Sequence, residues 1–88
     1  MDKIEMDKLI QDFTDYVMEK AQIKENYNIR DYDLDRVYLD VGDSTDNYTI
    51  RMWCLNKSFI RYTLFRTVEN YGVPVIESQV YRINRSIE

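Results

Sequence analysis

The sequence contains no histidine, one cysteine, one proline and two glycines. Without histidine, the chain cannot form a Ser-His-Asp or Cys-His catalytic arrangement, and it has no imidazole to ligate a metal or to titrate near neutral pH. The single cysteine, Cys54, excludes an intramolecular disulfide and a cysteine-rich zinc site. The two glycines, Gly42 and Gly72, are too far apart to form a glycine-rich phosphate-binding loop. The sequence therefore predicts a protein that is not an enzyme.

Long apolar runs are also missing. No stretch approaches the roughly 20 apolar residues that a membrane-spanning helix requires. Residues 1–5 lack the apolar segment of a secretory signal peptide, so we expect a cytoplasmic protein. With 88 residues, of which 44% are hydrophobic and 32% charged, the chain predicts a single folded domain over 1–88.

The composition is biased toward a few residue types. Asparagine, isoleucine, lysine and tyrosine together number 28, whereas alanine, glycine and proline number 4. AT-rich codons encode the first group, so the composition favours an AT-rich genome. Small acidic chains of this kind are typical of accessory proteins of phages and mobile elements, and we expect a similar origin here.

Residues 3–24 have the pattern of an amphipathic helix. Apolar residues recur at spacings of three and four and form one stripe along it. The stripe consists of Met6, Leu9, Ile10, Phe13, Tyr16 and Val17. Asp2 and Glu5 have the spacing of a capping box at the start of this helix. Asn26 and Asn28 are expected to mark its end.

Beyond residue 32 the pattern changes to alternation, which predicts strands separated by turns. The strands are expected at 36–42, 48–55, 59–68 and 73–83. The turns are expected at 42–47, 56–58 and 70–72, where turn-forming residues cluster. The predicted fold class is therefore α+β, with one N-terminal amphipathic helix packed on a four-stranded antiparallel β-meander.

The loop at 56–58 decides which side chains share a face of the sheet. A two-residue turn would pair Met52 with Arg61, whereas a three-residue loop would pair Met52 with Tyr62. We prefer the second register because it gathers the apolar side chains on one face, and register follows the buried pattern. The opposite face, called here the Arg/aromatic face, then carries Arg51, Trp53, Arg61 and Phe65.

The Arg/aromatic face has three interpretations. Arginines interleaved with aromatic rings can stack on bases and pair with phosphate. Alternatively, Arg61 packs over Trp53 as a cation–π pair without any partner molecule. Finally, the face can be a protein interface, because tryptophan, tyrosine and arginine are frequent interface anchors. Since the chain is acidic overall, we rank contact with another protein, or a homodimer, above nucleic acid.

Asp31, Asp33 and Asp35 have the spacing that opens a calcium loop. The sixth position of such a loop should be glycine and the twelfth glutamate, but these positions are Arg36 and Gly42. The sequence therefore predicts neither a metal nor a cofactor. We interpret the three aspartates as a solvated acidic segment.

Charge is distributed unevenly along the chain. Residues 1–46 contain thirteen acids and six bases, a net of −7, whereas 47–88 contain three acids and six bases, a net of +3. An acidic surface suits a partner with a basic surface, such as a nucleic-acid-binding protein whose site it would occupy. A solvated surface without a partner is the alternative.

These features predict a small non-enzymatic interaction protein that binds and inhibits or regulates another macromolecule through an acidic surface. The candidate partner-binding residues are Asp31, Asp33, Asp35, Arg51, Trp53, Arg61 and Phe65. The alternative function is binding of a nucleotide or single-stranded nucleic acid on the Arg/aromatic face. We expect Trp53 to be partly exposed and to belong to an interface rather than to the core.

Overall fold

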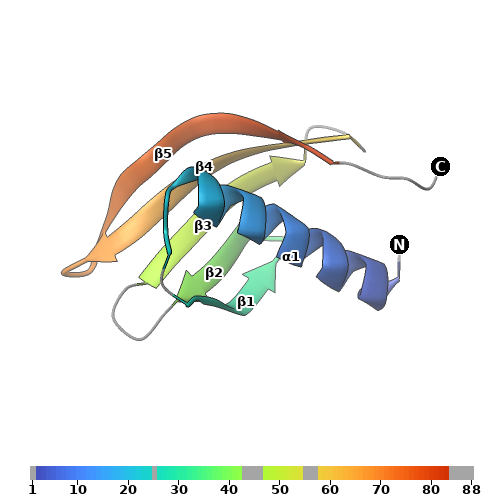
Figure 1. Ribbon diagram of the computed structural model, residues 1–88, viewed down its shortest axis with the longest axis horizontal. Helices are drawn as coiled ribbons and strands as arrows, with labels where there is room; N and C mark the ends of the chain where they lie inside the picture. Colours follow the sequence, from blue (N-terminus) through green and yellow to red (C-terminus); the bar gives the residue numbers. More distant parts are fainter. Residues whose placement is uncertain (1, 25, 43–46, 55–57, 84–88) are drawn as a thin grey trace.

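The computed structural model describes residues 2–24, 26–42, 47–54 and 58–83, in which one helix precedes five strands. The elements are α1 (Lys3–Lys20), β1 (Asn28–Asp33), β2 (Tyr38–Gly42), β3 (Asn47–Cys54), β4 (Phe59–Val68) and β5 (Tyr71–Arg82). The strands form one antiparallel sheet in the order β1-β2-β3-β4-β5, and α1 lies across one face of it (Figure 1). The α+β class is confirmed, but the sheet has five strands, whereas four were predicted.

The helix begins where the sequence predicts. The Asp2 carboxylate accepts a 2.8 Å hydrogen bond from the Glu5 amide, which satisfies one of the free N–H groups of the first turn. Most of the predicted apolar stripe faces the sheet, whereas Tyr16 remains 39% exposed. The fully buried helix residues are Ile10, Phe13, Thr14, Val17 and Met18.

The helix ends at Lys20, so the predicted end near Asn26 and Asn28 is wrong. The Ile23 amide donates to the Met18 carbonyl at 2.9 Å, as in a Schellman motif. Gln22 takes the left-handed conformation of that motif, with φ 60°. Glycine usually occupies this position, so the sequence gives no signal of the stop.

Strand β1 is absent from the sequence prediction. Its two core-facing side chains, Ile29 and Tyr32, are three residues apart rather than two. The register explains this spacing, because Ile29 pairs with Val41 and Tyr32 with Leu39, with an irregularity between Ile29 and Asp31. The irregularity is a β-bulge, which adds one residue and returns the next side chain to the same face. The bulge thus hides the strand from an alternation pattern.

The predicted register of β3 with β4 is confirmed. Met52 pairs with Tyr62 and Ile50 pairs with Leu64, as the three-residue loop requires. All four side chains are buried beneath α1. The predicted turns at 42–47 and 56–58 fall mostly on residues outside the described ranges.

Two further boundaries are set by residues with positive φ. Strand β2 begins at Tyr38 rather than residue 36, because Val37 has φ 61° and cannot continue an extended chain. The β4–β5 turn consists of Glu69 and Asn70, with φ 50° and 71°, which is a two-residue type I′ hairpin. Gly72, predicted to lie in this turn, belongs to β5.

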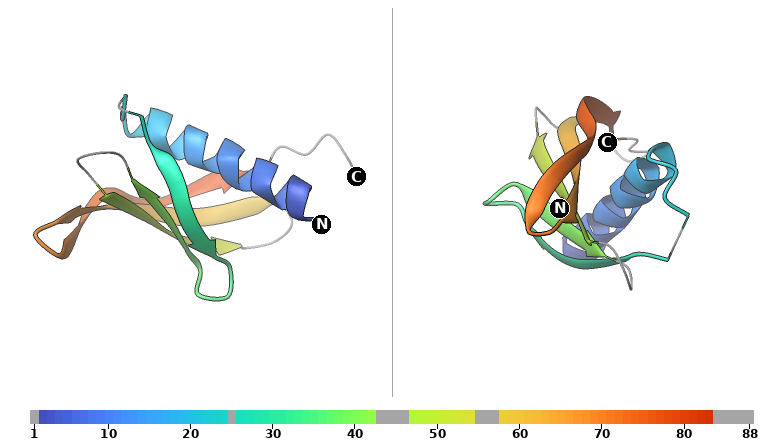
Figure 2. Two further views of the ribbon diagram at one scale, coloured as in Figure 1. Left: turned by 90° about the horizontal axis from the view of Figure 1, so that it is seen from below. Right: turned by 90° about the vertical axis from the view of Figure 1, so that its left-hand side faces the viewer.

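The core lies between α1 and the sheet face that it covers. The Phe13 ring meets the Tyr62 ring edge-on, with centroids 5.4 Å apart. The opposite face, called here the outer face, is covered by no described element (Figure 2). Within the described ranges, no helix combines the length and the apolar character needed to cross a membrane.

Candidate partner-binding site

The outer face brings together the candidate residues that the sequence separates. Side chains alternate along each strand, so the antiparallel register aligns outer-face residues in rows across the sheet. The three central rows are Asp31–Asp40–Thr49–Phe65–Pro74, Asp33–Tyr38–Arg51–Thr63 and Trp53–Arg61–Val80. Six of the seven predicted residues lie in these rows, and Asp35 lies in the adjoining β1–β2 turn.

Trp53 is the largest side chain exposed on this face. It is 44% exposed, whereas its neighbour Met52 is 1% exposed on the helix side of the same strand. The predicted partial exposure of Trp53 is therefore confirmed. Val80, which is 44% exposed, continues the apolar surface on β5, with Arg61 between the two in the register.

The two arginines of the outer face differ in their contacts. The Arg61 Nη1 donates a 3.2 Å hydrogen bond to Ser78 Oγ on β5, whereas Trp53 lies on β3, on the other side of β4. Among the described residues, the cation–π pair of Arg61 with Trp53, one of the three interpretations of this face, is not found. The Arg51 side chain is exposed and makes no hydrogen bond or ion pair with a described residue. Its guanidinium is available to an anionic group of a partner.

A shallow groove of about 460 Å³ crosses the outer face beside Arg51. Tyr38 and Phe65 supply aromatic surface, and Arg36 adds a second guanidinium. The remaining lining residues are small or polar, namely Thr49, Thr67, Asn70 and Gly72. The groove therefore suits a flat or extended group that carries negative charge.

The three aspartates of the acidic segment have different roles. Asp33 accepts hydrogen bonds from the amides of Asp35 (2.9 Å) and Arg36 (3.2 Å), and the Arg36 Nε lies 3.6 Å from its other oxygen. It therefore stabilises the β1–β2 turn. The carboxylates of Asp31 and Asp35 are exposed and accept no hydrogen bond from a described residue. In the part of the chain that the structure describes, no three acidic or cysteine side chains gather as metal ligands.

Asp31 lies directly opposite Asp40 in the register. Like charges in this position disfavour the sheet, and Asp40 is partly compensated by a 3.1 Å hydrogen bond from Thr49 Oγ1. The outer face therefore changes sign across its width. The β1–β2 side carries carboxylates, and the β3–β4 side carries Arg51 and Arg61.

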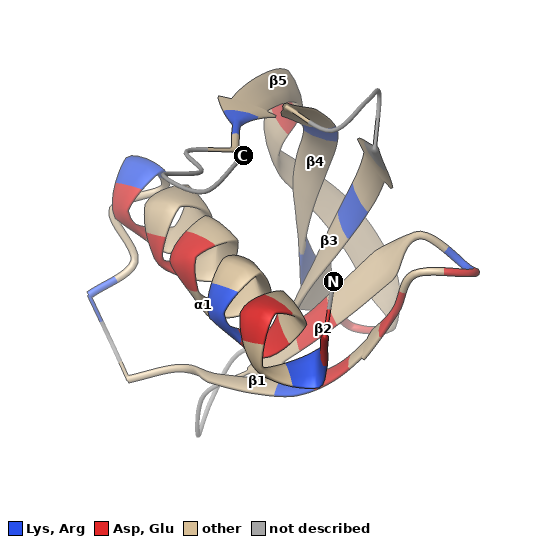
Figure 3. Cartoon of the chain, turned by 90° about the vertical axis from the view of Figure 1, so that its right-hand side faces the viewer, with Lys and Arg blue, Asp and Glu red and all other residues tan. Residues whose placement is uncertain are grey.

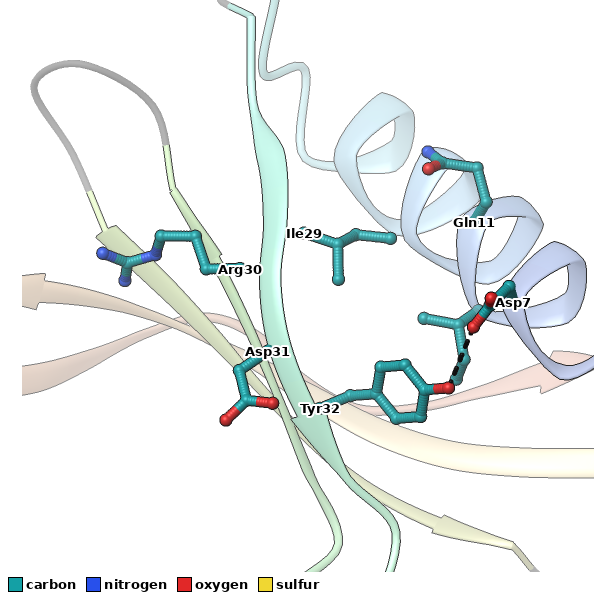
Figure 4. A pocket seen from close by; sticks show the side chains of 7 residues that line it. Asp7, Gln11, Ile29, Arg30, Asp31 and Tyr32 are labelled. Carbon is teal, nitrogen blue, oxygen red and sulfur yellow. Dashed lines mark hydrogen bonds between the residues drawn. The ribbon is translucent and has the colours of Figure 1, made fainter. Parts of the chain in front are cut away.

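A second groove, of about 340 Å³, lies between α1 and β1 (Figure 4). At one end Tyr32 donates a 3.0 Å hydrogen bond to Asp7, whose other oxygen accepts from Lys3 Nζ at 3.0 Å. The bonds from Lys3 and Tyr32 lower the pKa of Asp7, and the bond to Asp7 raises the pKa of Tyr32. Sequence reasoning missed this groove because it missed β1.

A second tyrosine–aspartate bridge joins α1 to the residue just before β1. The Tyr27 hydroxyl donates to the Asp15 carboxylate, which also accepts a 2.8 Å hydrogen bond from Gln11 Nε2. Burial and the bond to Asp15 raise the pKa of Tyr27. Asp12 is bonded to Lys8 at 3.4 Å. Three of the helix carboxylates are thus engaged within the chain, so the acidic charge of the helix is less available to a partner than the sequence implies.

Figure 3 shows that acidic residues dominate α1 and the β1–β2 side, whereas β3 and β4 carry basic residues. The charge asymmetry of the sequence is therefore also an asymmetry in space. Comparisons with protein-family models, with curated proteins and with solved structures find no match for this chain.

Proposed function

We propose that this chain is a small non-enzymatic interaction protein that binds another protein on its outer face and inhibits or regulates it by occupying its surface. The observation that carries the proposal is Trp53, 44% exposed on a sheet face that no described element covers. Exposed apolar surface of this kind marks interaction sites, and tryptophan flanked by arginine is a frequent anchor of protein interfaces.

The charge pattern supports a protein partner over a nucleic acid. Asp33 and Arg51 share a row and are two strand spacings apart, about 10 Å. This separation is comparable to the screening length at physiological ionic strength, so the carboxylates repel a polyanion that approaches the arginines. A folded protein can present a basic patch to the β1–β2 side and a carboxylate or apolar pocket to the β3–β4 side.

The proposed mechanism is steric occlusion. Trp53 anchors the contact, and the rows of opposite charge fix the orientation of the partner. The partner surface would be basic where it meets Asp31 and Asp35, whose carboxylates make no bond with a described residue. A basic surface of this kind often serves to bind nucleic acid, and a protein docked on it would block that use.

Quantitative affinity purification from the native host tests the proposal. The full chain, Trp53→Ala and Ile4→Ala are used in parallel, because Ile4 is 81% exposed on α1 and serves as a matched apolar control. We expect one protein to be recovered with the wild type and Ile4→Ala, and at least about tenfold less with Trp53→Ala. Equal recovery with folded Trp53→Ala would contradict the outer face as the binding surface.

Charge reversal tests the acidic side of the face. Asp33 must be left unchanged, because it accepts two backbone hydrogen bonds in the turn. Reversing Asp31 and Asp35 to lysine should weaken partner binding while the circular dichroism spectrum stays that of the wild type. Unchanged binding by the folded double variant would remove the acidic side from the interface.

The groove beside Arg51 favours a second candidate function, binding of a nucleotide or single-stranded nucleic acid. Tyr38 and Phe65 can stack on bases, and Arg36 and Arg51 can pair with phosphate. Trp53 is the sole tryptophan of the chain, so its fluorescence reports on the outer face directly. A saturable change in this fluorescence on titration with an oligothymidylate would favour this function, provided that the affinity falls as salt is added. If the chain binds only a protein partner, the fluorescence should not change.

A further inference from the structure

The open edge of β1 is a surface that the outer-face proposal does not use. β1 stands at the end of the strand order, so only its β2 side is paired within the described sheet. The backbone N–H and C=O groups on its other side are bonded by no described strand. An edge of this kind is a template for an added strand from another chain.

The groove between α1 and β1 lies along this edge. Ile10 and Ile29 form its apolar floor, and Gln11 lies on the helix side. Figure 4 shows Ile29 and Tyr32 pointing from β1 toward α1, whereas Arg30 and Asp31 point away. A strand added to β1 would therefore direct alternate side chains onto the two isoleucines.

Two tyrosine–aspartate bridges hold this segment to α1, one in the groove and one beyond it. Tyr32 is bonded to Asp7 in the groove lining, and Tyr27, just before β1, is bonded to Asp15, one turn beyond Gln11. The two aspartates are eight residues apart on α1, which corresponds to about 12 Å. An extended chain covers this distance with roughly three to four residues. The bulge in β1 likewise keeps the regular stretch of the edge short.

Charge selects the occupant of the groove. Asp7 lines the groove and is paired with Lys3, whereas Asp15, one turn beyond Gln11, accepts only from the neutral donors Tyr27 and Gln11 and keeps its negative charge. The side chains of Arg30 and Asp31, which carry opposite charges, both point away from the groove (Figure 4). The surroundings therefore favour an extended segment with basic side chains.

A second copy of the chain fits this edge poorly. Pairing β1 with β1 of another copy would set two acidic strands side by side, because each carries Asp31 and Asp33 against the single base Arg30. Pairing β1 with the opposite edge, β5, would leave both outer edges free and build an open filament. β5 also contains Pro74, which has no backbone N–H to donate, and Ser78 at φ 43°, and these features block strand addition.

We propose that the β1 edge binds an extended, basic segment of a partner protein as a sixth strand. The segment contributes three to four residues, with an apolar side chain on Ile10 and Ile29 between the two bridges. The proposal rests on the proposed function in that the occupant is another protein. It uses a different surface from the outer face, so either surface can be disproved separately.

The test is an NMR titration of the 15N-labelled full chain with a heptapeptide of alternating lysine and valine. We expect chemical-shift changes and slowed amide exchange over Asn28–Asp33, with a matching change at Gln11. A heptapeptide of alternating glutamate and valine should give no such change. An equal response to both peptides, or no response at β1, would overturn the inference. Shifts confined to Arg51 and Trp53 would also overturn it while supporting the outer face.

Two variants on the helix side of the groove sharpen the test. Gln11→Trp fills the mouth of the groove and Gln11→Lys repels a basic segment, so each should raise the Kd for the lysine–valine peptide at least about tenfold. Tyr16→Trp is the matched control, because Tyr16 lies on the opposite side of α1 and is also partly exposed. Wild-type affinity in both folded Gln11 variants would show that the peptide does not bind in the groove.

Discussion

Tyr32 and Asp7 join the edge strand of the sheet to the helix by a 3.0 Å hydrogen bond between residues 25 apart in the chain. The same carboxylate accepts from Lys3, so one side chain receives donors from the helix and from β1. Because β1 has no second strand neighbour in the described sheet, this bond and the bridge from Tyr27 to Asp15 hold the edge to the helix.

Replacing Tyr32 with phenylalanine should lower the melting temperature and increase amide exchange in β1. The pKa of Asp7 is lowered in the folded state, so its contribution is present above about pH 4 and is lost as pH falls through the folded value. The pKa of Tyr32 is raised, so its contribution is present below about pH 10 and is lost above. The stability difference between wild type and variant should therefore be largest between these limits. A difference independent of pH would contradict the role of the bond.

Replacing Tyr62 with phenylalanine should leave the fold at least as stable. The Tyr62 hydroxyl is buried and has no hydrogen-bond partner among the described residues. Removing it avoids the desolvation of an unpaired polar group, so the free energy of unfolding should stay equal or rise by up to about 1 kcal/mol. Phe13→Ala is the contrasting control and should cost about 3–5 kcal/mol, because Phe13 is 0% exposed. A clear loss of stability in Tyr62→Phe would reveal a partner for the hydroxyl.

The same tyrosine should make the protein sensitive to alkali. Burial raises the pKa of Tyr62 to about 12, whereas tyrosine in the unfolded chain ionises near pH 10. The unfolded state therefore loses its proton first, and stability falls as pH rises through this window. Denaturant titrations between about pH 9 and 12 should show a shallower fall for Tyr62→Phe than for the wild type. If the stability of both proteins falls equally with pH, ionisation of Tyr62 is not the cause of the loss.

The β4–β5 turn should accept a stabilising double substitution. Glu69 and Asn70 both have positive φ, which costs roughly 1–2 kcal/mol for an ordinary residue, and asparagine–glycine is the preferred type I′ pair. Glu69→Asn with Asn70→Gly should raise the free energy of unfolding by about 1 kcal/mol. Gly72→Asn is the control, because it also introduces an asparagine but places it in the strand rather than in the turn. Thermal denaturation measures the stability of both variants. A loss of stability in the turn variant would contradict the type I′ conformation of the turn.

Trp53→Ala should have little effect on the stability of the isolated chain. The side chain is 44% exposed and lies outside the core beneath α1, so the expected loss is about 1 kcal/mol or less. Chemical denaturation measures this loss in the free energy of unfolding, and the loss in Phe13→Ala is the reference for a core residue. If Trp53→Ala unfolds at room temperature, Trp53 is a core residue. That result would contradict the outer face as the partner-binding surface.

Alternation and helical periodicity predicted the elements that pack as regular units. The helix start at Asp2, the pairing of Met52 with Tyr62 and the exposure of Trp53 all follow from which side chains must be buried. The outer face was therefore recoverable from sequence, because burying one side of a strand fixes what the other side presents. Its use as an interface stays a prediction.

The departures share one physical cause, which is that non-glycine residues take conformations that a pattern does not reveal. Gln22 ends the helix, Val37 delays β2, and Glu69 begins a turn, all with positive φ. In β1, the bulge places Ile29 and Tyr32 three residues apart and conceals the strand. The α1–β1 groove depends on that strand, so no residue pattern could have predicted it.

The strand order has a consequence for how the chain acquires its structure. Every strand pairs with its neighbour in sequence, so the sheet closes through successive short loops rather than long-range searches. The helix is synthesised first, yet its apolar side packs on Tyr62, which emerges about forty residues later. At ribosomal rates this interval lasts about a few seconds, during which Phe13 lacks its packing partner on β4. Before β4 leaves the ribosome, the apolar side of the nascent helix is thus most accessible to chaperones and the chain is most exposed to proteases.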